Sequence, residues 1–380
     1  MKGAFTIARL FRIPVKIHWS FSLIFLYLGY IGYTESWDTP TIVISVSIVL
    51  SLFVCVVLHE FGHALTARLY GVQTRDIILS PIGGVARLDH LPEKPWQEFM
   101  VAVAGPMVNV VIAALLSIRY FSFPLDIRIR LFNGLMHPNS NTFLPNLSQF
   151  DFFLIILLFL NVTLALFNLL PAFPMDGGRV LRALLSLPLG RLRATHLAAR
   201  IGQAMAIVIV LVGIFYRPSL TYVLVGVFVF VTAGNEYRMV YIESLLEDYK
   251  VNALLRGQFT RVYATDPLSV LLPVVHSGVE KNFLVFDQWQ NLVGVLPEYR
   301  IHDAERKKDT TALVSKYMLP ELNPLLGSES LRHAFYILQS SNVGASPVYN
   351  QFNRLIGMVD AREMTSFLKS KTRKLWWKRA

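Results

Sequence analysis

The residues best suited to chemistry in this sequence are two histidines four positions apart, with a glutamate directly after the first. His59, Glu60 and His63 follow an uncharged stretch that runs from Thr41 to Leu58. If this stretch is helical, residues four positions apart share one face, so His59 and His63 can bind one metal ion. Neutral imidazole suits zinc, and Glu60 is then placed to accept a proton from water at the metal. Two histidines that only form hydrogen bonds inside a helix bundle are the alternative interpretation.

A catalytic zinc site usually has three protein ligands, and the sequence offers one acidic candidate for the third. Asp176 is the only carboxylate between Asp151 and Glu236. Pro171 and Pro174 precede it, and two prolines so close together cannot sustain a regular helix, so we expect the chain to unwind there. Irregular backbone inside a membrane is found where it lines a cavity or packs against protein. An aspartate that ends a helix and pairs with the next arginine is the alternative.

The composition and hydropathy are those of a membrane protein. Of the 380 residues, 54% are hydrophobic and 16% are charged, and the mean hydropathy is +0.47, whereas globular chains carry about 25% charged residues. A helix of about 20 apolar residues crosses a bilayer. We therefore expect a multi-pass α-helical membrane protein with six transmembrane helices, at 17–34, 41–69, 99–118, 151–175, 198–216 and 219–236.

Basic residues indicate which face of the membrane lies in the cytoplasm. They gather before the first expected span, from Lys2 to Lys16, and in the loops after the second and fourth spans. Because cytoplasmic loops are enriched in lysine and arginine, we expect both termini in the cytoplasm of a protein of the plasma membrane. The same rule accounts for the net charge of +11, so we do not infer binding to nucleic acid. The only cysteine, Cys55, is a weaker candidate ligand, because a lone cysteine is usually a small buried hydrophobe.

After about residue 250 the chain is less hydrophobic and contains an internal repeat. Residues 283–301 align without gaps on residues 346–364, so that Gly294 matches Gly357. Each copy predicts a strand, a polar turn, a second strand and the start of a helix. Further helices are expected before the copies, at 268–279 and 331–341. We expect these elements to form a soluble α/β tandem.

The motifs of the hydrophobic part resemble those of the site-2 protease family of intramembrane zinc metalloproteases. The resemblance rests on His-Glu-Phe-Gly-His at 59–63 and on Asn-Leu-Leu-Pro-Ala-Phe-Pro-Met-Asp-Gly-Gly at 168–178. Two further pieces agree, Pro-Ile-Gly-Gly-Val-Ala-Arg-Leu at 81–88 and Ala-Gly-Pro-Met-Val-Asn at 104–109. The repeated C-terminal part resembles a pair of cystathionine-β-synthase (CBS) domains, a combination found in the bacterial and archaeal branch of that family.

This resemblance implies a role for each site residue. His59, His63 and Asp176 would bind one Zn²⁺, Glu60 would be the catalytic base, and Asn168 would lie near the scissile peptide. The side-chain amide of Asn168 suits a donor to the oxyanion, and packing between helices is an equally good interpretation of it. The implied substrate is a membrane-tethered protein, which is cleaved within or beside its transmembrane segment in regulated intramembrane proteolysis.

The resemblance also implies a domain organisation. We expect a membrane metalloprotease domain at 1–245 and a cytoplasmic CBS pair with a basic tail at 246–380, the copies lying at about 260–310 and 318–372. CBS domains commonly bind adenine nucleotides and can form homodimers, so the pair is expected to modulate cleavage. The first copy lacks the residues of the family's nucleotide motif, so weak or no binding is expected there, whereas Glu363 of the second copy can accept hydrogen bonds from a ribose although Asp360 would repel a phosphate. A dimerisation or docking module without a ligand is the alternative interpretation.

Two alternative functions and one local feature remain. Another class of membrane protease with the same histidine motif would use a glutamate, Glu236 or Glu243, as the third ligand. A CBS-regulated channel or transporter would require no metal motif. Residues 72–91 predict a hairpin of strands at 76–79 and 85–88, whose open edge suits an extended substrate; a simple hairpin at the membrane surface is the other interpretation.

Overall fold

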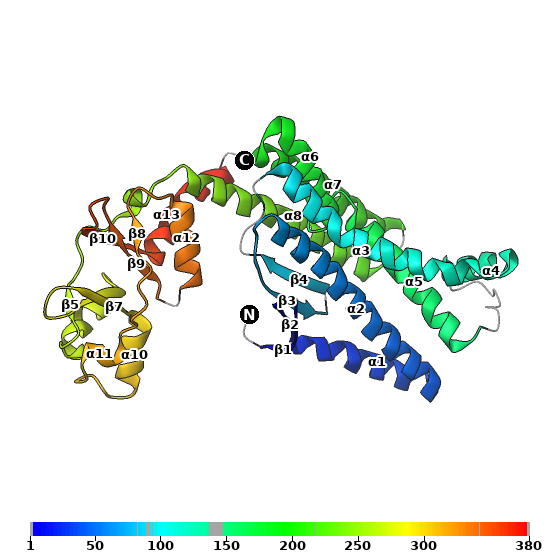
Figure 1. Ribbon diagram of the computed structural model, residues 1–380, viewed down its shortest axis with the longest axis horizontal. Coiled ribbons are helices and arrows are strands. Elements are labelled where there is room, and N and C mark those ends of the chain that lie inside the picture. The colour runs from blue at the N-terminus through cyan, green and yellow to red at the C-terminus, as the bar shows by residue number, and fades with distance from the viewer. Residues whose placement is uncertain are drawn as a thin grey trace. The chain divides into compact units, whose positions relative to one another are not determined.

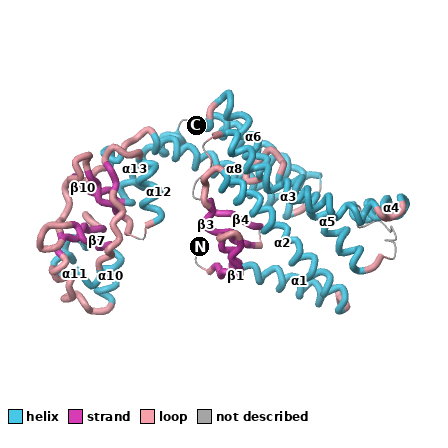
Figure 2. Tube along the Cα trace, viewed as in Figure 1, coloured by secondary structure: helices cyan, strands magenta, loops and turns pink. Residues whose placement is uncertain are grey.

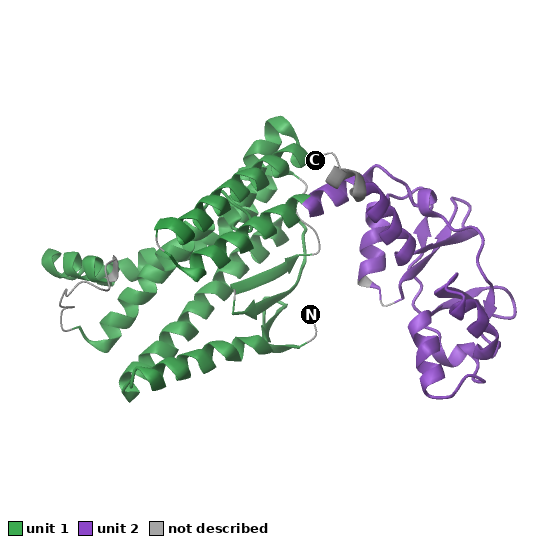
Figure 3. Cartoon of the chain, turned by 180° about the vertical axis from the view of Figure 1, so that it is seen from behind, with its two compact units in different colours: residues 1–237 green, residues 238–380 purple. Residues whose placement is uncertain are grey.

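The computed structural model describes residues 3–81, 83–88, 92, 94–136, 147–216, 218–341 and 343–377. Helices dominate the first part of the chain, and the described strands form three separate sheets (Figure 1 and Figure 2). The chain divides into two compact units, Met1–Tyr237 and Arg238–Ala380, here called unit 1 and unit 2 (Figure 3). The last expected residues of the basic tail, 378–380, lie outside the described part.

Long apolar helices make up most of unit 1. Large apolar side chains on them, such as those of Leu115 and Leu166, are mostly exposed, which suits a surface in contact with lipid. The membrane protein predicted from hydropathy is confirmed. Within the described residues, five helices are long and apolar enough to cross a membrane: α2 (Thr39–Leu69), α3 (Pro95–Phe121), α5 (Gln149–Asn168), α7 (Arg191–Leu211) continued by a π-helical turn (Val212–Tyr216), and α8 (Leu220–Glu247).

The first expected span differs from the structure. Helix α1 (Ser22–Thr34) has 13 residues, which is about 20 Å of helix, whereas the hydrocarbon core of a bilayer is about 30 Å thick. The helix expected over 17–34 is wrong at its start, because Ile17 and His18 lie in a strand and a 3-10 turn (Trp19–Phe21) follows. Hydropathy alone does not separate a short apolar strand from a helix. By length, the described residues thus confirm five spanning helices, and the sixth expected span is not confirmed.

Four strands of unit 1 form a sheet that packs against α2. Their order is β1 (Ala4–Leu10), β2 (Ile13–His18), β3 (Thr74–Ser80) and β4 (Gly83–Leu88), with β2 and β3 parallel and the other neighbours antiparallel. Apolar side chains of β2 and β3 pack on Phe61 and Ala64 of α2. The predicted hairpin is confirmed as β3 and β4. The two N-terminal strands are elements that the sequence analysis does not predict.

The chain leaves the helical path before Asp176. Helix α5 ends at Asn168, and α6 (Asp176–Leu189) begins at Asp176 itself. The unwinding predicted from Pro171 and Pro174 is confirmed, and the span expected over 151–175 ends earlier than hydropathy indicates, because apolar residues continue into the turn. Helix α4 (Leu125–Met136) follows α3 in the chain.

Unit 2 contains the two copies that the repeat predicts. Val285 pairs with Gly294 in the first copy, and Val348 pairs with Gly357 in the second, so both hairpins have the same register. The helix expected over 268–279 is a 3-10 turn (Leu268–Leu271) and a short helix, α9. The elements are β5 (Val262–Tyr263), α9 (Leu272–His276), β6 (Asn282–Phe286), β7 (Leu292–Pro297), α10 (Glu298–Arg306) and α11 (Val314–Tyr317), then β8 (Leu325–Leu326), α12 (Leu331–Ser340), β9 (Ala345–Tyr349), β10 (Leu355–Asp360) and α13 (Ala361–Trp377).

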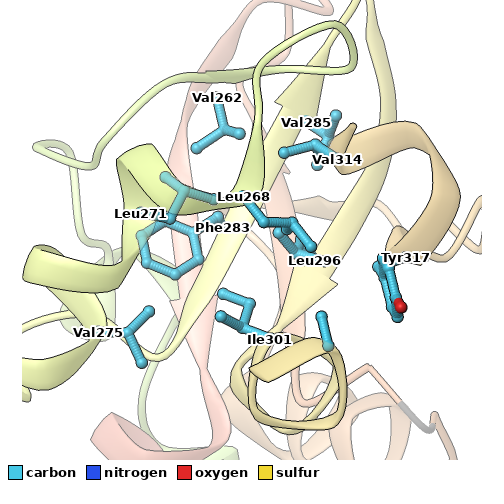
Figure 4. Close-up of a cluster of buried hydrophobic side chains, with 11 residues drawn as sticks. Val262, Leu268, Leu271, Val275, Phe283, Val285, Leu296, Ile301, Val314 and Tyr317 are labelled. Carbon is cyan, nitrogen blue, oxygen red and sulfur yellow. The ribbon is translucent and has the colours of Figure 1, made fainter. Parts of the chain in front are cut away.

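Each copy has its own hydrophobic core. In the first copy, Phe283 and Leu296 of the sheet pack with Ile301 of α10 (Figure 4). The core of the second copy includes Leu246, which lies near the end of α8. Helix α8 therefore begins in unit 1 and ends within the core of the second copy.

The copies are also joined to each other by backbone pairing. Arg256, which precedes the first strand of the first copy, pairs with Met358 of β10, and Leu319, which precedes the first strand of the second copy, pairs with Val295 of β7. Each pairing uses two hydrogen bonds of 2.8–3.1 Å. The segment before the first strand of each copy thus pairs with the sheet of the other copy.

Candidate metal centre

Helices α2 and α6 bring three buried side chains to one point. His59 Nε2 lies 3.1 Å from Asp176 Oδ2, and His63 Nε2 lies 3.0 Å from the same oxygen. The two Nε2 atoms are 3.1 Å apart. His59, His63 and Asp176 are 6%, 4% and 8% exposed, respectively, and they form a group that can hold a metal ion. The structure thus brings together the three ligands expected from the sequence.

The partners of the two imidazole rings determine which nitrogen faces this point. His59 Nδ1 lies 2.6 Å from Asn109 Oδ1, and His63 Nδ1 lies 2.7 Å from Val101 O. Because both partners are oxygen acceptors, each Nδ1 donates, and a neutral ring then has a lone pair on Nε2. In this neutral form, two nitrogen lone pairs and the Asp176 carboxylate converge on the same point. Zinc bonds to nitrogen and oxygen are about 2.0–2.2 Å long, so one ion can contact all three atoms.

A glycine of α3 provides the space behind this site. A Cβ on Gly105 would lie 2.7 Å from His59 Nε2 and would also collide with His63 Nε2. Helices α2 and α3 approach closely here: a Cβ on Gly62 of α2 would lie only 2.7 Å from the carbonyl oxygen of Ala104 of α3. Only a residue without a side chain at position 105 leaves the two Nε2 atoms accessible. This contact explains the Ala-Gly-Pro motif physically.

A chain of polar side chains extends from the site into the bundle. Asn109 Nδ2 donates to Asn161 Oδ1 at 3.0 Å, and Asn161 Nδ2 lies 3.4 Å from Cys55 Sγ. Asn109 is the last residue of the motif at 104–109, and the structure gives it a direct hydrogen bond with His59. The sequence motifs do not include Asn161, although an amide inside an otherwise apolar span is a signal of function. Cys55 interacts with Asn161 and does not join the group of three.

Tight packing holds the turn that carries Asp176. Gly177 packs so closely on the carbonyl oxygens of Leu169 and Leu170 that a Cβ there would collide with both. A Cβ on Gly178 would likewise lie 2.7 Å from the carbonyl carbon of Ala172. The start of α6 is thereby fixed against the end of α5. The alternative partner of Asp176, the guanidinium of the arginine three positions on, is 4.0 Å from Oδ1 and leaves Oδ2 facing the histidines.

Glu60 lies beside the three grouped side chains, but its carboxylate binds to a backbone amide of the sheet. Its Oε2 accepts a hydrogen bond from the backbone nitrogen of Ala86 at 2.8 Å. Strand β4 lies directly against this side chain, since a Cβ on Gly84 would be 2.9 Å from Glu60 Cγ. The buried carboxylate of Asp76 holds β4 on β3, because it accepts from Arg87 Nε at 2.5 Å. Glu60 is thus anchored by the edge strand next to the two histidines.

The remaining acidic and amide candidates lie in other surroundings. Glu236 accepts from Arg182 Nη1 at 2.7 Å, and Glu243 accepts from the Tyr336 hydroxyl at 2.7 Å. Among the described residues, the group that can hold a metal ion includes neither glutamate. Asn168 is the last residue of α5 and is half-buried. In the described part of the chain, the hydrogen bonds of the three grouped side chains do not include Asn168.

Comparison with known proteins places this site in a family. Residues 47–212, which include all the grouped side chains, match the model of peptidase family M50. The chain is 35% identical over 268 residues to the zinc metalloprotease MJ0392 of Methanocaldococcus jannaschii, covering 69% of each chain. It is 28% identical to the putative zinc metalloprotease sll0528 of Synechocystis, covering 78% of this chain and 76% of that protein.

Solved structures give weaker similarities. The site-2 protease from Methanocaldococcus jannaschii is 33% identical, with coverage of 62% of this chain and 95% of that one and a TM-score of 0.43. The CBS domain pair of protein MJ0100 is 15% identical, with coverage of 32% of this chain and 98% of that one and a TM-score of 0.29. The family match and the identity to MJ0392 are decisive: the chain belongs to peptidase family M50 and is a membrane zinc metalloprotease of the site-2 protease type.

Proposed function

We propose that this protein cleaves a peptide bond within or beside the transmembrane helix of a membrane-tethered substrate, with zinc held by His59, His63 and Asp176. The observation that carries the proposal is the convergence of two Nε2 lone pairs and one carboxylate oxygen at 3.0–3.1 Å, buried among apolar helices. When bound, zinc lowers the pKa of a coordinated water toward about 7 and polarises a carbonyl oxygen.

Glu60 is the proposed general base. It directly follows His59 in the chain, is not one of the three grouped side chains, and is oriented by the Ala86 amide. In this role its carboxylate accepts a proton from the attacking water and delivers it to the leaving amine. Asn168 is the last residue before the turn that leads to Asp176. We assign its side-chain amide as a hydrogen-bond donor to the oxyanion, in addition to the metal.

The edge of β4 is the proposed place for the substrate backbone. Peptide hydrolysis needs an extended segment, because a helix keeps its carbonyl groups in its own hydrogen bonds. β4 is the last strand of its sheet, and the Ala86 amide points away from β3 toward Glu60. A substrate strand added to this edge would lie beside the catalytic base.

The finer topology is also part of the proposal. We assign α1 as a sixth membrane segment and place both termini in the cytoplasm of a plasma-membrane protein. The assignment of the sides is supported by the basic residues at both ends of the membrane domain and in the loops that follow His63 and Asp176. The site then lies near the cytoplasmic leaflet.

We assign residues 246–380 to a CBS pair that modulates the protease and can mediate a homodimer. Helix α8 supports a regulatory role, because one continuous helix runs from the membrane domain into the core of the second copy. In that copy Glu363 Oε1 lies 3.9 Å from Arg256 Nη1. These groups favour the second copy over the first as the place for an adenine nucleotide.

The direct test uses the full chain in nanodiscs. Zinc content is measured on the same preparation as cleavage of a reporter whose single transmembrane segment carries a fluorophore and a quencher on opposite sides. We expect one zinc per chain, loss of cleavage with a chelator, and recovery when zinc is restored. Stoichiometric zinc without cleavage of any tethered reporter, or cleavage that survives full removal of metal, contradicts the proposal.

A further inference from the structure

A second buried charge cluster lies on α6, close to the turn that carries Asp176. Arg182 has no exposed surface, and its Nε donates to Glu98 Oε1 at 2.6 Å. Its Nη1 donates to Glu236 Oε1 at 2.7 Å. Glu98 belongs to the first turn of α3, and Glu236 belongs to α8. One guanidinium therefore joins three helices.

The same guanidinium also contacts the turn itself. Arg182 Cζ lies 5.1 Å from the centroid of the Phe173 ring. Phe173 is only 1% exposed, stands three positions before Asp176, and packs with alanines of α7 and α8, including Ala199 and Ala233. Arg182 thus supports the turn from the inside while its two carboxylate partners hold the guanidinium in place.

Buried charges of this kind are a poor source of stability. The cost of removing three charged groups from water is of the same order as their mutual attraction, and apolar replacements are often neutral or stabilising. A buried ionic cluster can instead specify one arrangement among several that packing alone would allow. Here the arrangement concerns the start of α6, where Asp176 is the first helical residue. Its place is therefore determined by the turn and by α6, with no preceding helical turn to hold it.

We propose that Arg182 is a positioning residue for Asp176. Held by Glu98 and Glu236 and packed on Phe173, it fixes the turn so that Asp176 Oδ2 stays within 3.1 Å of both histidine nitrogens. A lysine cannot replace it, because an ammonium is a point charge that lacks the planar fork needed to bind two carboxylates and stack on a ring. The inference rests on the proposed role of Asp176 as a metal ligand.

The test compares Arg182→Lys with Arg119→Lys in the full chain. Arg119 is the control at a second interhelical ion pair, with Asp151 at 2.7 Å between α3 and α5, and it is more exposed than Arg182. Two readouts are independent of turnover: metal affinity by chelator competition, and the visible absorption spectrum of the Co²⁺-substituted protein, which reports the ligand geometry. We expect Arg182→Lys to lower the affinity for the metal about 10–100-fold. It should also change the Co²⁺ spectrum and lower kcat with little change in KM. Arg119→Lys should leave all four quantities unchanged.

A second variant covers the possibility that Arg182→Lys does not fold. The combination Arg182→Met, Glu98→Gln and Glu236→Gln removes all three charges together, so no charge is left buried alone, and it should keep wild-type thermal stability without metal. This triple variant should still show the lowered metal affinity and the altered Co²⁺ spectrum. Wild-type metal affinity and spectrum in either folded variant overturn the inference. Asp176→Ala is measured in parallel: if it too leaves the affinity unchanged, the proposed ligand set itself is wrong, whereas loss in Asp176→Ala alone rejects only the role of Arg182.

Discussion

The Glu60 carboxylate is bound to a backbone amide of the sheet, with its Oε2 2.8 Å from the nitrogen of Ala86. A helix of the membrane domain and the edge strand of a sheet thus meet at the residue next to the first histidine. This contact orients a carboxylate without occupying the lone pairs of His59 or His63. In the proposed roles, metal binding and proton transfer would therefore use different side chains.

Replacing Glu60 by glutamine should therefore keep zinc and remove activity. Glutamine retains an oxygen that can accept from Ala86, but it cannot accept a proton at neutral pH. We expect unchanged zinc content and a fall in kcat of at least about 10²–10⁴-fold, the usual contribution of a general base. Both quantities are measured on one preparation. Retained turnover would reject Glu60 as the base, and lost zinc would make it a ligand.

Asp176→Ala should lose both zinc and activity. The variant removes the only carboxylate oxygen of the group and leaves two histidines, which is one protein ligand fewer than a catalytic zinc site usually has. Metal affinity should fall by more than the roughly 10–100-fold typical of outer residues. Equilibrium dialysis against a zinc buffer measures this. An unchanged affinity would assign the third ligand elsewhere.

Gly105→Ala should abolish metal binding through a single methyl group. The new Cβ would lie 2.7 Å from His59 Nε2 and would collide with His63 Nε2. Gly29→Ala in α1 is a matched control, because nothing lies within 4 Å of its Cβ position. We expect a zinc-free variant and a control with wild-type zinc content, both determined by metal analysis. Zinc at one equivalent in Gly105→Ala would show that the helices separate easily at this point.

Asn109 should affect the metal through His59. Its Oδ1 accepts from His59 Nδ1 at 2.6 Å and so fixes which ring nitrogen is free. Asn109→Leu should lower the affinity for zinc about 10–100-fold. Asn109→Asp keeps an oxygen acceptor for His59 and should retain most of the affinity. Competition with a zinc-selective chelator separates the two. Equal affinities in both variants would mean that Asn109 only packs between helices.

The two copies of unit 2 should differ in nucleotide binding. Calorimetry of the full chain with AMP, ADP and ATP should show no more than one site per chain. Glu363→Ala in the second copy should remove it, and Arg300→Ala at the equivalent position of the first copy should not. Two equivalent sites, or binding that survives Glu363→Ala, would contradict the assignment. No binding at all would favour a docking or dimerisation role for the pair.

Much of the fold follows from local patterns in the sequence. Runs of apolar residues indicate the long helices, the two prolines before Asp176 predict the break between α5 and α6, and the repeat predicts two hairpins of equal register. The start of the first span is misjudged, because Ile17 and the aromatic residues Trp19 and Phe21 extend the apolar run of α1 towards the N-terminus, although they lie in β2 and a 3-10 turn. Strand pairing between residues far apart in the chain, as between β2 and β3, leaves no periodic signal of its own.

Residue types and their spacing within single elements are enough to predict the available chemistry: two histidines on one helix face, a glutamate between them and one acid in a distant apolar segment. The surroundings of these residues become apparent only in the folded chain: the acceptors that orient both imidazoles, the glycine that leaves them accessible, the strand that anchors Glu60 and the charge cluster close to Asp176. The physical reason is that each of these contacts joins elements that are distant in the chain and adjacent only after the helices and strands have packed.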